Sequence, residues 1–202
     1  MRVYKILPKT KAEGPGIRFC IWVQGCGHHC KGCFAKRLWD YEDGDHMSAD
    51  QVIVELSRVI DEVEGITFLG GEPFDQAEEL EMVARYVKEH EKNVITFSGY
   101  TYETLLENEK YKGLLEYTDL LCDGPYIEEL TDYSRPLLGS SNQRFIFLSD
   151  AITKEEMDRY HNSFEIRVSK NGQIEVNGMG NINKLKDYLL QISGGENGYT
   201  SI

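Results

Sequence analysis

Short apolar runs alternate with amphipathic segments along most of this chain. The runs at 19–23, 66–69, 94–97, 120–123 and 145–148 are typical of buried strands. Apolar residues between them recur every three or four positions, which predicts helices. The first helix is expected to begin at a capping box of Ser48 and Gln51 and to end at Gly65. The other helices are expected at about 76–90, 102–107, 112–116 and 154–160.

Strands that alternate with helices imply a parallel sheet with right-handed crossovers. A complete eightfold barrel usually needs about 250 residues, which is more than this chain supplies. The predicted fold class is therefore α/β, with a partial (β/α) barrel, or strongly curved sheet, of about five or six parallel strands and helices outside.

The end of the chain follows a different pattern. Residues 164–168 alternate between apolar and polar, and Asn171-Gly172 is a strong hairpin signal. A β-hairpin is therefore expected, followed by a last helix at about 182–191. The predicted organisation is a single domain over 1–193, with its core at about 14–150, and a flexible tail over 194–202.

Three cysteines follow the first predicted strand, at spacings of four and three residues: Cys26, Cys30 and Cys33. A closed structural zinc site usually takes four ligands, and no fourth cysteine is near in sequence. Three clustered thiolates suit an iron–sulfur cluster with one iron left open. A zinc site completed by His28 or His29, or a redox pair, is the alternative, although both histidines are expected to face solvent.

The composition narrows the class of protein. The net charge of −12, from 22 basic and 34 acidic residues, argues against nucleic acid as a partner. Five cysteines, three of them within eight residues, do not form a secreted disulfide framework, and Cys20 is expected to be a buried, inert thiol. Without an apolar leader or membrane span, the cytoplasm is the predicted compartment, with no membrane partner.

Other candidate residues directly follow predicted strands: Gly70-Gly71-Glu72-Pro73, Ser98-Gly99 and Asp123. The carboxyl ends of parallel strands meet at one edge, so these residues should converge with the cysteines. A ligand could lie against the bare glycines while its amino group meets Glu72 and strand-edge carbonyls. Ser98 could bind a sugar hydroxyl, and Asp123 a hydroxyl, amine or cation. The structural alternatives are a tight turn for Gly70-Gly71-Glu72-Pro73, a helix cap for Ser98 and a surface turn for Asp123. Asn142 could likewise be no more than a turn residue.

Several motifs carry a family resemblance. Gly14-Pro15-Gly16-Ile17-Arg18, the cysteine triplet and Trp39 resemble the radical S-adenosylmethionine enzymes that activate glycyl radical enzymes. Gly70-Gly71-Glu72-Pro73 resembles that family's motif for the methionine amino group. The stretches 118–126 and 139–144, with 97–100, are similar to the anaerobic ribonucleotide reductase activating proteins.

The resemblance implies a 4Fe–4S cluster on Cys26, Cys30 and Cys33, whose fourth iron chelates S-adenosylmethionine. One-electron reduction would break a carbon–sulfur bond and release methionine and a 5′-deoxyadenosyl radical. That radical would take hydrogen from a glycine of a partner glycyl radical enzyme, with a flavodoxin or ferredoxin as electron donor. The cofactor-binding residues implied are Gly32, Phe34, Gly70, Gly71, Glu72, Ser98, Asp123 and Asn142.

The chain also departs from the family pattern. Ala35 stands where these activators often carry asparagine, and Trp22 where phenylalanine is common. Gly32 replaces an aromatic residue, as it does in the ribonucleotide reductase subgroup. Ala35 in particular leaves the partner open. The alternatives are a radical enzyme acting on a peptide or small molecule, such as a deazaguanine synthase, and a non-catalytic metal-binding module.

Overall fold

A computed structural model describes residues 1–180 and 190. Its central feature is a seven-stranded sheet with the strand order β3-β1-β2-β4-β5-β6-β7. Those strands are β1 Arg2–Thr10, β2 Arg18–Val23, β3 Asp45–His46, β4 Gly65–Gly70, β5 Asn93–Phe97, β6 Leu120–Asp123 and β7 Arg144–Phe147. The α-helices are α1 Ala49–Ser57, α2 Ala77–Glu89, α3 Tyr102–Glu107, α4 Glu109–Tyr117 and α5 Lys154–Arg159. A hairpin pairs β8 Phe164–Val168 with β9 Ile174–Gly178.

The predicted strands all form, but the sheet is mixed. Only β2, β4, β5 and β6 run parallel. The last predicted strand, β7, pairs antiparallel with β6, which corrects the expectation of five or six parallel strands. Among the strands that the structure describes, β3 and β7 are the two edges and do not pair with each other, so the sheet is open and a barrel is not confirmed.

The N-terminal strand β1 was not expected. It pairs antiparallel with β2, with register shifts between Val3 and Lys5 and between Leu7 and Thr10. Each shift moves the following side chains to the other face. The shifts therefore break the alternation of apolar and polar residues that identifies a strand in sequence.

The helices differ from prediction mainly at their ends. The Ser48–Gln51 capping box is present, but α1 stops at Ser57. A short 3-10 helix, Ile60–Glu62, then buries Ile60, which continues the apolar stripe without a longer α-helix. Apart from Leu190, the predicted last helix and the 194–202 tail lie outside the described residues. The single-domain organisation stays a prediction. In the described part of the chain, no helix is long and apolar enough to cross a membrane.

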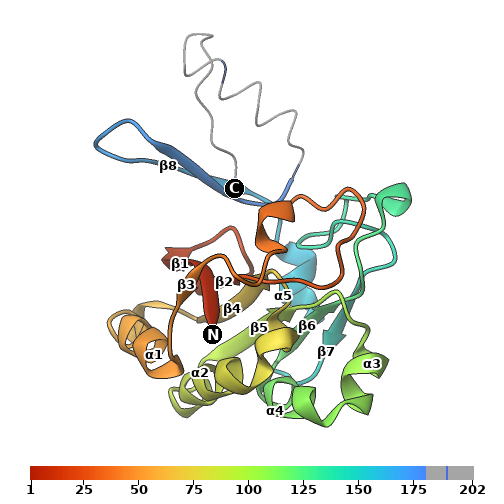
Figure 1. The fold of residues 1–202 in the computed structure, drawn as a ribbon, viewed down its shortest axis with the longest axis horizontal. Helices are drawn as coiled ribbons and strands as arrows, with labels where there is room; N and C mark the ends of the chain where they lie inside the picture. The colour runs from red at the N-terminus through yellow and green to blue at the C-terminus, as the bar shows by residue number, and fades with distance from the viewer. Residues whose placement is uncertain (181–189, 191–202) are drawn as a thin grey trace.

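The two faces of the sheet have different surroundings. Helices α1, α2 and α4 cover one face, where Ile21, Phe68 and Leu121 belong to the largest apolar core. Figure 1 shows these helices on one side of the sheet and the β8–β9 hairpin on the other. On that other face, Trp22 and Leu69 are paired across β2 and β4 and pack with Cys20 and Leu38.

A buried arginine holds the amino end of β2. The Arg18 side chain is fully buried, and its nitrogens donate to Thr67 Oγ1 and Asn93 Oδ1 at 2.7 Å, Ile66 O at 2.5 Å, and Pro15 O and Asn93 O at 3.3 Å. Burial lowers the pKa of Arg18 to about 10, so the guanidinium stays charged at neutral pH. The Gly14–Arg18 motif is thereby fixed at the end of the sheet opposite the cysteines.

We expect Arg18→Lys to lower the free energy of unfolding by about 2–4 kcal/mol, because lysine cannot satisfy five acceptors from one nitrogen. Chemical denaturation followed by circular dichroism measures the change. The control is Arg58→Lys, whose side chain is 63% exposed and pairs with Glu55. That control should change stability by no more than about 0.5 kcal/mol. Equal effects of the two substitutions would contradict the structural role of Arg18.

Candidate active site at the carboxyl edge of the sheet

The cysteine loop leaves the end of β2 and returns to its own base. Gly25 N donates to Leu38 O at 2.9 Å, and Cys26 N donates to Trp39 O at 3.1 Å. Within the loop, Cys33 N donates to Cys30 O at 3.1 Å. These hydrogen bonds close the loop, and all three cysteine side chains line one cavity.

The three thiols are free and partly buried. Burial raises the pKa of Cys26 to about 11 and also raises the pKa of Cys30. Both groups are therefore protonated at neutral pH in the metal-free protein. A bound metal must displace these protons, since thiolates are the ligands of iron and zinc.

Three free thiols from one loop that line one cavity are a donor set that suits an iron–sulfur cluster. Within residues 1–180 and 190, no three or more His, Cys, Asp or Glu side chains are grouped so as to hold one metal ion. A 4Fe–4S cluster places its thiolates on different irons, so its ligands need not meet at a point. His29 is exposed, as predicted, and stacks on Trp39 with ring centroids 4.6 Å apart.

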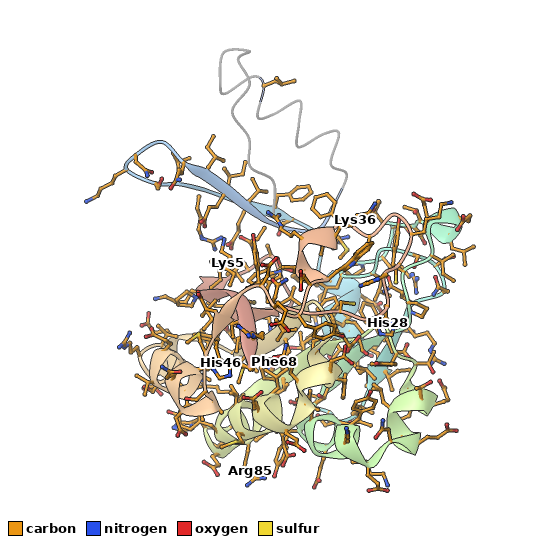
Figure 2. The ribbon with its side chains drawn as sticks, in the orientation of Figure 1. Lys5, His28, Lys36, His46, Phe68 and Arg85 are labelled. Atoms are coloured by element: carbon orange, nitrogen blue, oxygen red, sulfur yellow. The ribbon has the colours of Figure 1, made fainter. Side chains whose placement is uncertain are left out.

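The position predicted for His28 was wrong. Its side chain is only 19% exposed, and Nε2 lies 3.1 Å from Glu72 Oε2. This hydrogen bond raises the pKa of His28. The ring also packs edge-on against Tyr100, with centroids 4.4 Å apart. His28 is therefore a bridge from the cysteine loop to β4 and β5, and Figure 2 shows it within the body of the molecule.

Glu72 is fully buried and has all its acceptor positions engaged by the protein. Its Oε1 accepts from Ser98 Oγ at 2.9 Å and from Phe74 N at 3.0 Å. Its Oε2 accepts from Gly99 N at 2.7 Å, in addition to the contact with His28. The carboxylate thus joins three segments of the chain. Glu72 is also among the residues that line the cavity, and its contact with a ligand stays a prediction.

Glycine is required at positions 70 and 71 by the backbone segment packed beside them. Gly71 N donates to Val23 O, and Glu72 N donates to Gly25 O, both at 2.8 Å. A Cβ on Gly71 would lie 2.1 Å from Gly25 O, and Gly70 has a φ of +109° with no room beside Val23. The turn after β4 therefore packs directly on the base of the cysteine loop. Both glycines also line the cavity, so their backbone is still accessible to a ligand.

The remaining predicted residues divide into two groups. Phe34 and Ser98 line the cavity, whereas Gly32, Asp123 and Asn142 are not among its lining residues. Asp123 is fully buried and receives Tyr102 N at 2.7 Å and Arg144 Nε at 3.0 Å, so it forms an internal ion pair.

Asn142 has one free acceptor. Its Nδ2 donates to Pro125 O at 2.8 Å, while its buried Oδ1 has no hydrogen-bond partner in the described chain. A buried, unsatisfied acceptor carries a free-energy cost, so this atom is suited to a donor on a bound molecule.

The cavity has a volume of about 580 Å³ and extends from the cysteines along the face of the sheet without α1, α2 and α4. Its walls are mainly apolar, with Trp22, Leu69 and Phe97 from three adjacent strands. Sequence reasoning missed these residues as site candidates. The sequence did contain a signal for them. Side chains alternate between the two faces of a strand, and these three are the last residues of β2, β4 and β5 on the face that lines the cavity.

A buried carboxyl group, that of Glu13, also lies in the wall of the cavity. Glu13 is 5% exposed, and its Oε1 accepts from Asn177 Nδ2 of β9 at 3.1 Å. Burial raises the pKa of Glu13 from 4.5 to about 7, although Asn177, Gly178 and Arg167 act in the opposite direction. The sequence did not single out Glu13, because an acidic residue before a Gly-Pro-Gly turn looks like a surface residue.

Comparison with known proteins supports the cluster site. The sequence model of a family described as "4Fe-4S single cluster domain" matches residues 12–146. The anaerobic ribonucleoside-triphosphate reductase-activating protein of Vibrio cholerae is 31% identical over 150 residues, covering 71% of this chain and 96% of that protein. The protein of the same name from Enterobacteria phage T4 is 30% identical over 162 residues, covering 77% and 100%. The structure of QueE from Escherichia coli aligns over 60% of this chain and 69% of that chain, at 16% identity and a TM-score of 0.43.

We expect Gly71→Ala to reduce iron binding, because the new Cβ would displace the base of the cysteine loop. After anaerobic reconstitution, this variant should hold less than about half the iron of the unmodified protein. Gly27→Ala is the control from the same loop, since a Cβ there would meet only the Tyr41 hydroxyl, at 3.4 Å. Full iron content in Gly71→Ala would contradict the packing argument.

A second expectation concerns pH. The folded protein holds a proton on Glu13 up to about pH 7, whereas the unfolded chain loses it near 4.5, so folding stability falls as pH rises through this window. Glu13→Gln stays neutral and has no such loss. Its unfolding free energy relative to the unmodified protein should therefore rise by about 1–3 kcal/mol between about pH 5 and about pH 8. Denaturation curves at several pH values measure this difference, and a constant difference would contradict the burial of Glu13.

Proposed function

Because this chain belongs to the 4Fe-4S single cluster domain family and to the radical S-adenosylmethionine activating enzymes within it, we propose that it installs a glycyl radical on a partner protein. The partner class is an anaerobic ribonucleotide reductase, which the names of its relatives specify for those proteins. The observation that carries the proposal is that the three free thiols and the Gly70-Gly71-Glu72 turn line one cavity inside the matched region.

Cys26, Cys30 and Cys33 would hold a 4Fe–4S cluster. When bound, that cluster supplies the electron that cleaves S-adenosylmethionine to methionine and a 5′-deoxyadenosyl radical. The chain's own side chains orient the reactants and keep water out. Trp22, Leu69 and Phe97 give the cavity an apolar wall that offers a reactive radical few polar partners.

S-adenosylmethionine is proposed to lie against the ends of β4 and β5. Because the Glu72 carboxylate is occupied, the main-chain carbonyls of the Gly70-Gly71 turn are the better acceptors for its amino group. Ser98 lines the same wall, but its hydroxyl donates to Glu72 and accepts from Tyr100 N at 3.0 Å. A ribose hydroxyl would have to share these bonds. A contact of Asn142 with the cofactor stays a prediction, since Asn142 is not among the lining residues of the cavity.

The partner is proposed by class because the residues around the third cysteine depart from the family pattern. Ala35 lines the cavity at the position where related activators often carry asparagine. A flavodoxin or ferredoxin as electron donor stays a prediction, as does cytoplasmic location. A peptide or small molecule as substrate is an outcome that the following experiment distinguishes.

We expect the reconstituted protein to bind about four irons per chain and no zinc. With dithionite, S-adenosylmethionine and the anaerobic ribonucleotide reductase of the same organism, it should generate a glycyl doublet in the electron paramagnetic resonance spectrum. Cys30→Ala should abolish both the iron and the doublet. Cys122→Ala should keep both, since Cys122 is 1% exposed and lies within the core.

Three results would redirect this proposal. Zinc without cleavage of S-adenosylmethionine would leave a non-catalytic module. Cleavage without a doublet, with product formed from a peptide or purine precursor, would indicate another substrate. Retention of the doublet in Cys30→Ala would remove the cluster assignment.

A further inference from the structure

The β8–β9 hairpin has one polar face and one apolar face. Its register pairs Ile166 with Val176 and Val168 with Ile174, so these apolar side chains share a face. The alternate pairs, Glu165 with Asn177 and Arg167 with Glu175, occupy the other face. A two-stranded hairpin alone has little stability in water, so contacts with the rest of the chain must hold it in place.

The polar face is the one that contacts the body of the protein. Glu165 accepts from Thr10 Oγ1 and from Lys11 N, both at 2.7 Å. Asn177 Nδ2 donates to Thr10 Oγ1 at 3.0 Å and to Glu13.

Two further contacts extend this anchor. Arg167 bonds to Glu165 and Asn177 and donates to Lys9 O at 3.1 Å. At the other end of β9, Glu175 pairs with Lys5 of β1 at 2.9 Å. Lys5 lies on the side of the body toward the hairpin in Figure 2. The contacts run from β1 to both hairpin strands, so the face turned toward the body is fixed.

The apolar face is therefore turned away from these anchors. Part of it lines the cavity that holds the cysteines, through Phe164, Ile174 and Val176. The rest is open, since Ile166 is 39% and Val168 is 67% exposed. This is the reverse of the usual arrangement, in which the apolar face of a strand pair packs on the core. An apolar surface continuous with a reaction cavity is suited to a substrate segment.

The hairpin also lies outside the part of the chain shared with the family. The family match ends at residue 146, whereas the hairpin begins at Phe164. The cysteines and the Gly70-Gly71 turn, by contrast, are inside the match. The cavity is thus built from one wall inside the family match, which carries the thiols, and a second wall outside that match.

We propose that the apolar face of the hairpin is the substrate wall of the site, and that Phe164, Ile174 and Val176 receive the segment of the partner protein that carries the target glycine. This inference rests on the proposed function and adds the element that selects the partner. The chemistry of the wall specifies the segment: the residues beside the glycine are apolar, because a charged neighbour would lose its hydration against this face.

The test is Val176→Asp, with Val54→Asp as the matched control. Val54 is 52% exposed on α1, on the opposite side of the sheet from the cavity. In the reconstituted enzyme, Val176→Asp should raise the concentration of ribonucleotide reductase needed for half-maximal radical formation by about tenfold or more. Iron content should stay within about twofold of the unmodified enzyme, which reports that the variant is folded and still holds its cluster. Val54→Asp should change none of these quantities.

Two results would overturn the wall assignment. One is an unchanged half-maximal concentration in Val176→Asp. The other is an equal loss of iron content and radical formation, which would place Val176 in the structure of the cluster site. Either result can be interpreted only when the unmodified enzyme gives a glycyl doublet. If the unmodified enzyme gives no doublet, that failure counts against the proposed function itself.

Discussion

The site depends on the close approach of two backbone segments, the base of the cysteine loop and the turn after β4. Gly71 and Glu72 donate their amides to Val23 O and Gly25 O, both at 2.8 Å, and no side chain fits between the segments. The Glu72 carboxylate then gathers donors from the loop, from β5 and from its own turn. A buried carboxylate is tolerated only with such partners, so each segment fixes the position of the others.

Sequence reasoning located this edge of the sheet but could not show how its polar side chains are bonded. Apolar runs and strand ends predicted which segments would meet, because the direction of a parallel strand fixes where its carboxyl end lies. They could not show that Glu72 and Asp123 are bound internally, since an acidic residue after a strand looks the same whether it faces a ligand or Arg144. The position of His28 could not be predicted either, since a loop histidine looks the same in sequence whether it faces solvent or Glu72.

The fold shows a similar limit. Short apolar runs identified β2, β4, β5, β6 and β7, but strand direction is a tertiary property, so the antiparallel course of β7 was not visible. The register shifts of β1 removed its pattern altogether. The hairpin was predicted because Asn171-Gly172 is a local signal, whereas its orientation depends on Thr10, Lys11 and Glu13, far away in sequence.

The anchoring of the hairpin has a consequence for how such enzymes could diversify. Among the residues that the structure describes, its polar contacts with the body fall on residues 5–13, and none involves the cysteine loop or the turn after β4. Mutations on the exposed part of the apolar face can therefore accumulate without altering the cysteine loop or the turn after β4. Under the proposed function, the substrate range of the protein could evolve, or be engineered, by exchanging one short supersecondary unit while the cysteine site is retained.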